Sequence, residues 1–309
     1  MMYLIDCPPH DPSGMLVKQR LDAAGQLSAF INIADFPKSA MLSYNPVSPE
    51  SGTLCLPNHP RPIGLETIRG VFRRGSEWIS TQPHYDFMLP QLVYWNMESA
   101  LGSLYRLLTN CTWMNSLETF NAHYHKGFQL HQFSQLGIRI PRTLITNRPE
   151  DVVTFFEQEQ GQVIVKYPFG GKETIKLTYD NMVHPSFATH LQQIPIKVQE
   201  CIVGMDIRVY VVGDTCFALE IQTDALDFRE TPHAFRKPIT LPKTVEQQCL
   251  VLCKTLGLLM AGIDIKRTAE GEYVFLEANP SPVFLYDEVT TGYPISQQIC
   301  EVLLGAVCK

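Results

Sequence analysis

The feature that most constrains this chain is a pair of strand-like segments near its C-terminal end, written AGIDIKRTAEGEYVFLEANPSPVF. Alternating apolar residues predict strands over residues 262–266 and 273–278, joined by a tight turn. Asp264 lies in the first strand, and Glu277 and Asn279 lie at the end of the second. On a hairpin, the oxygens of these three side chains can converge on one site.

Two carboxylates and an amide carbonyl are oxygen donors that Mg²⁺ accepts in proteins, beside phosphate oxygens and water. For an arbitrary set of such residues, the better interpretation would be that Asp264 is a turn residue and that Glu277 is a solvated charge on a strand. Two features favour a metal site here. Glu277 and Asn279 share a face of their strand, and Pro280 and Pro282 end the ladder immediately afterwards. Asp264, Glu277 and Asn279 are therefore the candidate magnesium ligands.

Two lysines place positive charge where phosphate groups would lie. Lys126 follows in the helical segment after Asn115, and Lys166 ends the apolar strand QVIVK. Taken singly, each is better explained as an ordinary solvated lysine whose stem packs against its own element. The glycine turn at Gly170 and Gly171 changes this balance, because bare backbone N–H groups there could close over phosphate oxygens. The turn lacks the GxxxxGK[ST] pattern and is not a P-loop.

A third element is VQECIVGMDIRVYVVGD, in which an apolar strand bends at Gly204 and leads into a second strand. Such a passage offers the backbone amide edges and apolar faces that adenine binding requires. Arg208 alternates with apolar residues and would point from the sheet to a common face, although a surface ion pair with Asp206 explains it about equally well. Arg229, in the segment LDFRE, is a further candidate for holding an anion. The candidate nucleotide contacts in this element are Gln199, Glu200, Cys201, Ile202 and Asp206.

Together these motifs resemble the ATP-grasp superfamily, in the branch of the ribosomal-protein glutamate ligases. More narrowly, NSLETFNAHYHKGFQLHQFSQLGIRIPRTLITN, the early FRR, LDFRE and the ending TGYPI are similar to the ATP-grasp ribosomal peptide maturases. Those enzymes are the ligases of microviridins and other graspetides. The resemblance covers nearly all of the chain. Two positions depart from it: Phe72 stands where tryptophan or tyrosine is more usual, and Phe228 replaces the tryptophan of a DWR motif.

The resemblance implies an α/β (α+β) chain with the ATP-grasp fold. An N-terminal α/β domain over residues 1–114 would precede two α+β subdomains, residues 115–198 and 199–309, that sandwich ATP. Lys126 and Lys166 would contact the ATP phosphates. The resemblance further implies that residues 199–202 line the adenine, that Arg208 lies near the transferred phosphoryl group, that Arg229 steadies the acyl phosphate or incoming carboxylate, and that Asp264, Glu277 and Asn279 hold two magnesium ions.

The implied substrate is a precursor peptide with a leader and an acidic core that contains Ser, Thr or Lys. Its Asp or Glu side chains would be activated with ATP and joined to hydroxyls or an amine. A ligase that adds an amino acid to a protein or a small-molecule carboxylate would use the same site. A regulator that binds nucleotide without turnover is a third hypothesis, but such a binder has less need of a complete set of metal ligands. A homodimer is compatible with the resemblance, although no pattern here marks an interface.

Composition limits the partners and the location. The 309 residues include 31 acidic and 25 basic side chains, and no basic stretch exceeds a pair such as Arg73 and Arg74, so no nucleic-acid partner is expected. The N-terminal sequence MMYLIDCPPHDPSG lacks the pattern of a signal peptide, and no apolar run reaches the ~20 residues that would span a membrane. Nine cysteines without a CxxC pair fit reduced thiols, so we expect a cytoplasmic protein.

The remaining pattern predicts a mixed order of strands and helices. Residues 37–90 are rich in Pro, Gly, Ser and Asn, which predicts long loops with a hairpin. One helical pattern begins after Asn115 and ends at Gly137. Elsewhere we expect strands at residues 3–5 and 30–33, helices at residues 15–24 and 88–108, a helix beginning at Pro149, a hairpin turning at Gly213, a helix capped by Thr244 and a final helix over residues 294–304.

Overall fold

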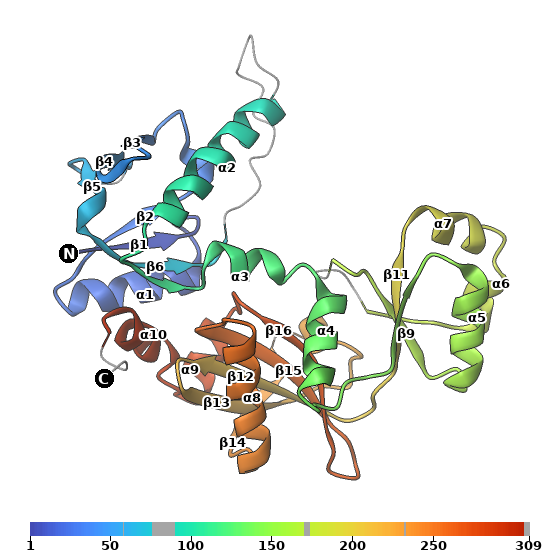
Figure 1. The fold of residues 1–309 in the computed structure, drawn as a ribbon. Coiled ribbons are helices and arrows are strands. Elements are labelled where there is room, and N and C mark those ends of the chain that lie inside the picture. The colour runs from blue at the N-terminus through green and yellow to red at the C-terminus, as the bar shows by residue number, and fades with distance from the viewer. Residues whose placement is uncertain (58, 76–89, 170–173, 232, 306–309) are drawn as a thin grey trace.

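The computed structural model describes residues 1–57, 59–75, 90–169, 174–231 and 233–305. Figure 1 shows three bodies: a blue and teal N-terminal part, a green and yellow central part that stands apart, and an orange and red C-terminal sheet below the first. Gly170 and Gly171, the predicted phosphate-closing turn, lie outside the described residues. No helix in the described part of the chain combines the length and apolar character needed to cross a membrane.

The N-terminal part is built on a parallel sheet in the order β2-β1-β6-β7. Strand β1 is buried at every position, as expected for a central parallel strand covered on both faces. The helix expected after it begins where the Asp11 carboxylate accepts from the Gly14 N–H at 2.7 Å. The elements of the sheet and its helices are β1 (Met2–Asp6), α1 (Pro12–Ala23), β2 (Leu27–Ile31), η1 (Ile33–Asp35), η2 (Leu65–Thr67), β6 (Ile68–Arg73), α2 (Pro90–Leu107) and β7 (Thr112–Met114).

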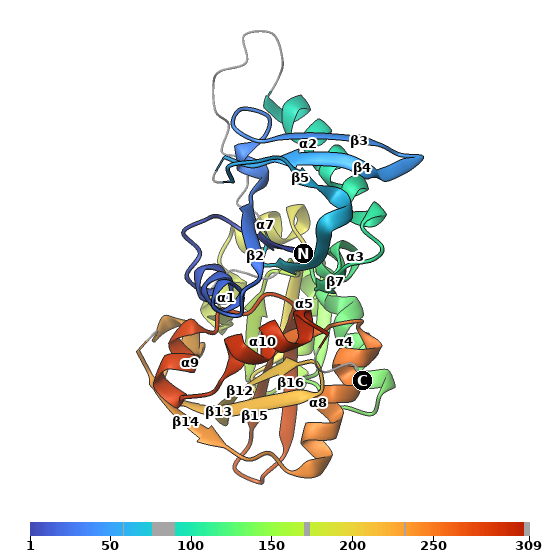
Figure 2. The ribbon, with the colours of Figure 1, turned by 90° about the vertical axis from the view of Figure 1, so that its left-hand side faces the viewer.

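A small antiparallel sheet rises above this part, as Figure 2 shows at the top of the molecule. It confirms the hairpin expected within residues 37–90 and adds a third short strand. Its strands are β3 (Met41–Asn45), β4 (Ser48–Cys55) and β5 (Ile63–Gly64).

The central part is an antiparallel sheet in the order β10-β9-β11-β8, and three helices cover one of its faces. Val163 and Val198 point to the helices and are fully buried in a core with Val152, Leu177 and Leu191. Because side chains alternate across a strand, the neighbours of these valines point to the opposite face. The elements are β8 (Thr143–Thr146), α5 (Pro149–Gln158), β9 (Val163–Lys166), β10 (Ile175–Lys176), α6 (Tyr179–Val183), α7 (Phe187–Gln193) and β11 (Ile196–Glu200).

The C-terminal sheet has five antiparallel strands in the order β14-β13-β12-β15-β16. Helices α4 and α8 pack on one face, whereas α10 lies between the other face and the N-terminal part (Figure 2). The predicted hairpin turn at Gly213 is confirmed, with φ of +59° at that glycine. The elements are β12 (Met205–Val212), β13 (Thr215–Gln222), η3 (Phe228–Glu230), β14 (Phe235–Ile239), α8 (Lys243–Thr255), β15 (Met260–Arg267), β16 (Tyr273–Asn279), α9 (Leu285–Thr291) and α10 (Ile295–Leu303).

Two helix predictions were wrong in detail. The pattern after Asn115 forms two helices, α3 (Leu117–Ala122) and α4 (Lys126–Gln135), because the backbone leaves helical geometry at His125, with φ of −91° and ψ of +66°. Helix α8 is capped by Pro242 and not by Thr244, since the Pro242 carbonyl already accepts the first helical hydrogen bonds. Helix α9 was not predicted.

Asn115 connects the N-terminal part to the strands that carry the candidate metal ligands. Its side chain is buried, and its amide nitrogen donates to the carbonyls of Met260 and Pro280, both at 2.8 Å. Its amide oxygen accepts from the N–H groups of Leu259 at 2.8 Å and Met260 at 3.1 Å. All four hydrogen-bonding positions of the amide are therefore used, and they hold the start of β15 beside the end of β16.

We expect Asn115→Ala to lower the free energy of unfolding by about 3 kcal/mol or more, because buried backbone groups would lose their partners. Urea denaturation of the full chain measures the change. Asn96→Ala is the control, since the exposed Asn96 amide donates to the Leu92 carbonyl within its own helix. That control should cost less than about 0.5 kcal/mol. A loss below about 1 kcal/mol in Asn115→Ala would contradict the structural role.

Candidate active site

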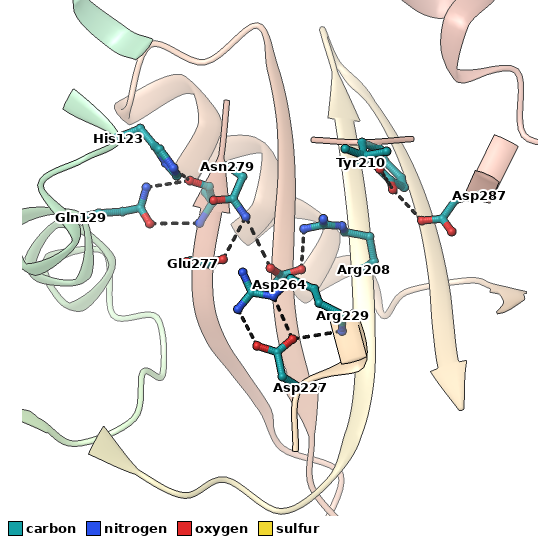
Figure 3. Close-up of polar contacts among 12 residues, drawn as sticks. His123, Gln129, Arg208, Tyr210, Asp227, Arg229, Asp264, Glu277, Asn279 and Asp287 are labelled. Carbon is teal, nitrogen blue, oxygen red and sulfur yellow. Dashed lines mark hydrogen bonds and ion pairs between the residues drawn. The ribbon is translucent and has the colours of Figure 1, made fainter. Parts of the chain in front are cut away.

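The three candidate metal ligands lie side by side at the end of the β15–β16 hairpin. Asp264 pairs with Glu277, and Gly262 pairs with Asn279, so the three side chains share one face of the sheet (Figure 3). The ladder shifts register after Asp264, because Ile265 pairs with Phe275. This bulge leaves Leu276 without a direct partner and re-aims the strand just before Glu277.

The contacts among these side chains are direct. The Asn279 amide nitrogen donates to Glu277 Oε1 at 3.0 Å and to Asp264 Oδ2 at 3.4 Å. The described residues contain no group of three His, Cys, Asp or Glu side chains placed to hold a metal ion. The cluster instead offers two carboxylates and one amide, a set of oxygen donors that fits Mg²⁺ when phosphate oxygens and water supply the other ligands.

Lys126, predicted as a phosphate contact, lies within this cluster. Its ammonium group is buried, lies 3.2 Å from Glu277 Oε2 and donates to Asn279 Oδ1 at 3.1 Å. Burial would raise the pKa of Glu277, but Lys126 and the other nearby cations hold that pKa well below its usual range. Glu277 is therefore an anion at neutral pH, as metal binding requires.

Two side chains of the α3–α4 region hold the backbone between the ligands. Gln129 donates to the Ala278 carbonyl at 2.8 Å and accepts from the Ala278 N–H at 3.0 Å, as a further strand would. His123 Nδ1 lies 3.2 Å from the same carbonyl. Burial, and then the Lys126 charge, lowers the pKa of His123 to about 4, so it is neutral at pH 7. Sequence reasoning missed Gln129, although a polar residue beside the apolar stripe of Leu130 was the available signal.

Arg208 is buried beside Asp264, and its interpretation as a surface cation paired with Asp206 was wrong. Its Nη1 donates to Asp264 Oδ1 at 2.5 Å, and its guanidinium carbon lies 5.6 Å from the ring centres of both Tyr210 and Phe228. Burial raises the pKa of Asp264 to about 7, against the opposing effect of Arg208. Asp206 is bonded to Lys266 at 2.8 Å.

Arg229 lies at the mouth of the same site. Its Nε donates to Asp227 Oδ1 at 2.8 Å, and a second guanidinium N–H bonds the other carboxylate oxygen of Asp227. The Thr174 hydroxyl donates to that same oxygen at 3.1 Å, which links the central part to η3. The hydrogen bonds from Arg229 hold the pKa of Asp227 low, at about 2, even though burial raises it. Asp227 thus fixes the orientation of Arg229.

The predicted adenine-binding residues form the end of β11 and the bend after it. Gln199 is buried and donates to Thr143 Oγ1 at 2.9 Å. The Glu200 carboxylate accepts from the backbone N–H of Arg142 at 3.0 Å, and Cys201 N–H donates to the Gln162 carbonyl at 2.9 Å. The N–H of Ile202 bonds no group in the described ranges. These hydrogen bonds hold the bend in place at Gln199, Glu200 and Cys201.

Lys166 ends β9 and directly faces Lys197 on β11. Sequence reasoning missed Lys197, which is 5% exposed. The signal was present, because a lysine interrupts the apolar residues of the segment IPIKVQECI.

A known protein family matches the part of the chain that carries this site. The model of the RimK-like ATP-grasp domain matches residues 125–303. This chain belongs to the RimK-like ATP-grasp family. A probable alpha-L-glutamate ligase of Pseudomonas savastanoi pv. phaseolicola is 31% identical over 186 residues, which cover 56% of this chain. The match spans 61% of the length of that relative.

Solved structures of ATP-grasp enzymes match almost the whole chain. The macrocyclase MdnC of Microcystis aeruginosa, solved with its precursor peptide MdnA, is 26% identical with a TM-score of 0.88, over 99% of this chain and 100% of that one. The ATP-grasp ligase PsnB, complexed with a minimal precursor, is 27% identical with a TM-score of 0.81, over 98% of each chain. Another PsnB complex, with Mg and ADP, is 25% identical with a TM-score of 0.82, over 98% of this chain and 97% of that one. The predicted ATP-grasp fold is confirmed, and use of ATP and Mg²⁺ is a general property of this family.

Proposed function

We propose that this ATP-grasp protein is a cytoplasmic ligase that activates Asp or Glu side chains of a precursor peptide as acyl phosphates. It then forms ester or amide crosslinks within that peptide. One observation carries the proposal: two carboxylates and an amide converge at a strand end and are ringed by cations, in a fold shared over nearly the whole chain with enzymes solved with precursor peptides.

ATP would lie between the central part and the C-terminal sheet, with residues 1–114, 115–198 and 199–309 as the three units. Lys126 and Lys166 would bind its phosphates, and Gly170 and Gly171 would close over them. The adenine would lie at the bend of β11. The Ile202 N–H, which bonds no described group, supports this placement because an adenine nitrogen could accept from it. The other contacts proposed for the nucleotide are Gln199, Glu200, Cys201 and Asp206.

Asp264, Glu277 and Asn279 would hold two Mg²⁺ ions together with the phosphate oxygens. When bound, magnesium neutralises the charge on the phosphates. Lys126 keeps Glu277 ionised, and Arg208 stabilises the anionic form of Asp264. Glu277 is therefore anionic at neutral pH, whereas Asp264, whose pKa burial raises to about 7, would release its remaining proton when a metal ion binds.

The reaction has two steps. A carboxylate oxygen of the peptide attacks the γ-phosphorus of ATP, which gives an acyl phosphate and ADP. A Ser or Thr hydroxyl or a Lys amine then attacks the acyl carbon, inorganic phosphate leaves, and the nucleophile loses a proton. Arg208 would lie near the transferred phosphoryl group, and Arg229, oriented by Asp227, would steady the incoming carboxylate and the acyl phosphate. Positioning and charge neutralisation account for most catalysis of this kind.

A second candidate function is the ATP-dependent addition of an amino acid to a protein or a small molecule. The 31% identity to a probable alpha-L-glutamate ligase favours it. Such an enzyme would use the same phosphate, metal and arginine contacts and would differ only in the acceptor.

Mass spectrometry of the product separates the two functions. The purified full chain is incubated with ATP, Mg²⁺ and a precursor peptide whose core is acidic and contains Ser, Thr and Lys. We expect the peptide to lose the mass of one or more waters, and we expect no loss with Glu277→Ala. A mass increase by one amino acid, when free glutamate is supplied, would establish the second function. Absence of ATP turnover with every acceptor would instead indicate a nucleotide-binding regulator.

A further inference from the structure

Lys197 is a buried lysine on the central sheet that the roles assigned above do not use. It lies on β11, where it pairs directly with Lys166 on β9 and with Ile145 on β8. Only 5% of its surface is exposed. Lysine is among the residues least often buried unless a partner compensates its charge.

The face to which Lys197 points follows from strand alternation. Val198, the next residue, is fully buried in the core beneath α5 and α7. Lys197 therefore points to the opposite face, away from those helices and toward the C-terminal sheet. Lys166 lies on that same face, because residues directly opposite in a ladder share a face.

Neither lysine forms a hydrogen bond or ion pair within the described part of the chain. Like charges directly opposite in a sheet destabilise it. The charged groups near Lys197 are Lys166 on β9, Lys126 on α4, Arg229 on η3 and Glu277 on β16, and Glu277 already pairs with Lys126. Three of these four neighbours are cations. The arrangement costs free energy in the ligand-free protein and would be compensated by a polyanion between the sheets.

We propose that Lys197 binds the polyphosphate chain of ATP together with Lys166, as a pair of lysines on the central sheet. This inference rests on the proposed function, because it assumes that the nucleotide lies between the central and C-terminal sheets. It adds a phosphate contact from the middle of β11 to those from α4 and the end of β9. Lys197 lies opposite Ile145 in the ladder, and its long methylene stem would let the ammonium group reach the phosphates.

The protonation of Lys197 provides an independent readout. Burial first, and then the Lys166 charge, lowers the pKa of Lys197 to about 8. Bound phosphates raise that pKa, since an anion favours the charged ammonium. Nucleotide binding near pH 8 therefore takes up about half a proton at this site, and affinity falls as pH rises from 7.5 to 9. Lys126, whose pKa is also lowered, remains in a Lys197 variant, so the difference between proteins isolates Lys197.

The test is calorimetric titration of the full chain with AMPPNP in the presence of Mg²⁺. It is carried out at pH 8 in two buffers that differ in ionisation enthalpy. Lys197→Met keeps the apolar stem and removes the charge. Lys243→Met is the matched control, since Lys243 opens α8 on the opposite face of the C-terminal sheet. Thermal unfolding of each ligand-free protein is measured in parallel.

We expect Lys197→Met to weaken AMPPNP binding by roughly 10- to 100-fold and to abolish most of the proton uptake. Its ligand-free melting temperature should stay equal or rise, because the repulsion with Lys166 is removed. The control should change neither affinity nor proton uptake. Unchanged affinity and proton uptake in Lys197→Met would overturn the proposal, as would weaker binding that is accompanied by a lower melting temperature. These outcomes do not depend on which acceptor is ligated. The proposed peptide substrate is tested separately, by mass spectrometry of the product.

Discussion

Replacing Glu277 with glutamine is expected to lower kcat for ligation by roughly 1,000-fold or more. Glutamine keeps the shape of the side chain but removes the charge that pairs with Lys126 at 3.2 Å and that would neutralise magnesium. Steady-state ADP release with the precursor peptide measures the loss. Glu272→Gln, an exposed position on the same hairpin, is the control and should leave kcat within about twofold. Activity of Glu277→Gln within tenfold of the unchanged protein would contradict the proposed metal site.

The same substitution has a stability effect with a definite pH dependence. The pKa of Glu277 is held well below its usual range in the folded protein, against burial, mainly by Lys126. A depressed carboxyl pKa stabilises the fold above the unfolded pKa, and this contribution is lost as pH falls through the folded value. Urea denaturation should therefore show the largest difference between the unchanged protein and Glu277→Gln at pH 7. The difference should narrow below about pH 4, where the unfolded glutamate is protonated. A constant difference across this range would mean that the ion pair does not act through the charge of Glu277.

The candidate metal site was predictable because its geometry is local. Two strands joined by a short turn bring Asp264 and Glu277 opposite each other, and a period of two fixes the side on which Asn279 lies. The proline that follows shows where the strand ends. These features depend on about twenty consecutive residues, so the sequence alone was sufficient to group the three side chains.

The partners of the arginines were not predictable in the same way. Arg208 bonds Asp264 because β12 pairs with β15, although the two residues are 56 positions apart and four elements lie between their strands. The nearby Asp206 was an equally good partner on the sequence alone. Asp206 instead lies opposite Lys266 in the same ladder, so a single register of β12 against β15 determines the partners of both Asp206 and Arg208. Register between distant strands is set by packing of the whole sheet.

The position of Lys126 depends on a helix break that periodicity did not reveal. In a continuous helix from Leu117 onward, the direction of the Lys126 side chain would follow from its position in that helix. The non-helical backbone at His125 starts a new helix, and Lys126 becomes its first residue, aimed at the end of β16. The buried pair of Lys166 and Lys197 likewise depends on the register of β9 against β11. Both features concern how segments meet, and segment patterns alone do not determine that.

Replacing Arg208 with lysine is expected to lower kcat by roughly 100-fold while nucleotide affinity changes by less than about threefold. The Arg208 guanidinium carbon lies 5.6 Å from the ring centres of Tyr210 and Phe228, and its Nη1 donates to Asp264 at 2.5 Å. A planar group with several N–H donors can hold Asp264 and also reach the transferred phosphoryl group. Lysine keeps the charge and has three N–H donors, but they share one nitrogen and lack the planar fork of the guanidinium, so lysine cannot reproduce the geometry that spans Asp264 and the phosphoryl group.

Single-turnover measurements of acyl phosphate formation, with the Kd for Mg²⁺ and AMPPNP measured separately, distinguish loss of chemistry from loss of binding. Arg267→Lys is the control, because Arg267 ends β15 in the same sheet and pairs with Glu220 at 2.6 Å, away from the metal ligands. Its kcat should stay within about twofold. If Arg208→Lys weakened AMPPNP binding as strongly as it lowered kcat, Arg208 would already stabilise the bound nucleotide in the ground state. The role at the transferred phosphoryl group would then be wrong. A large loss of kcat with little loss of AMPPNP affinity places the contribution of Arg208 in the transition state, where the charge on the phosphoryl oxygens is redistributed.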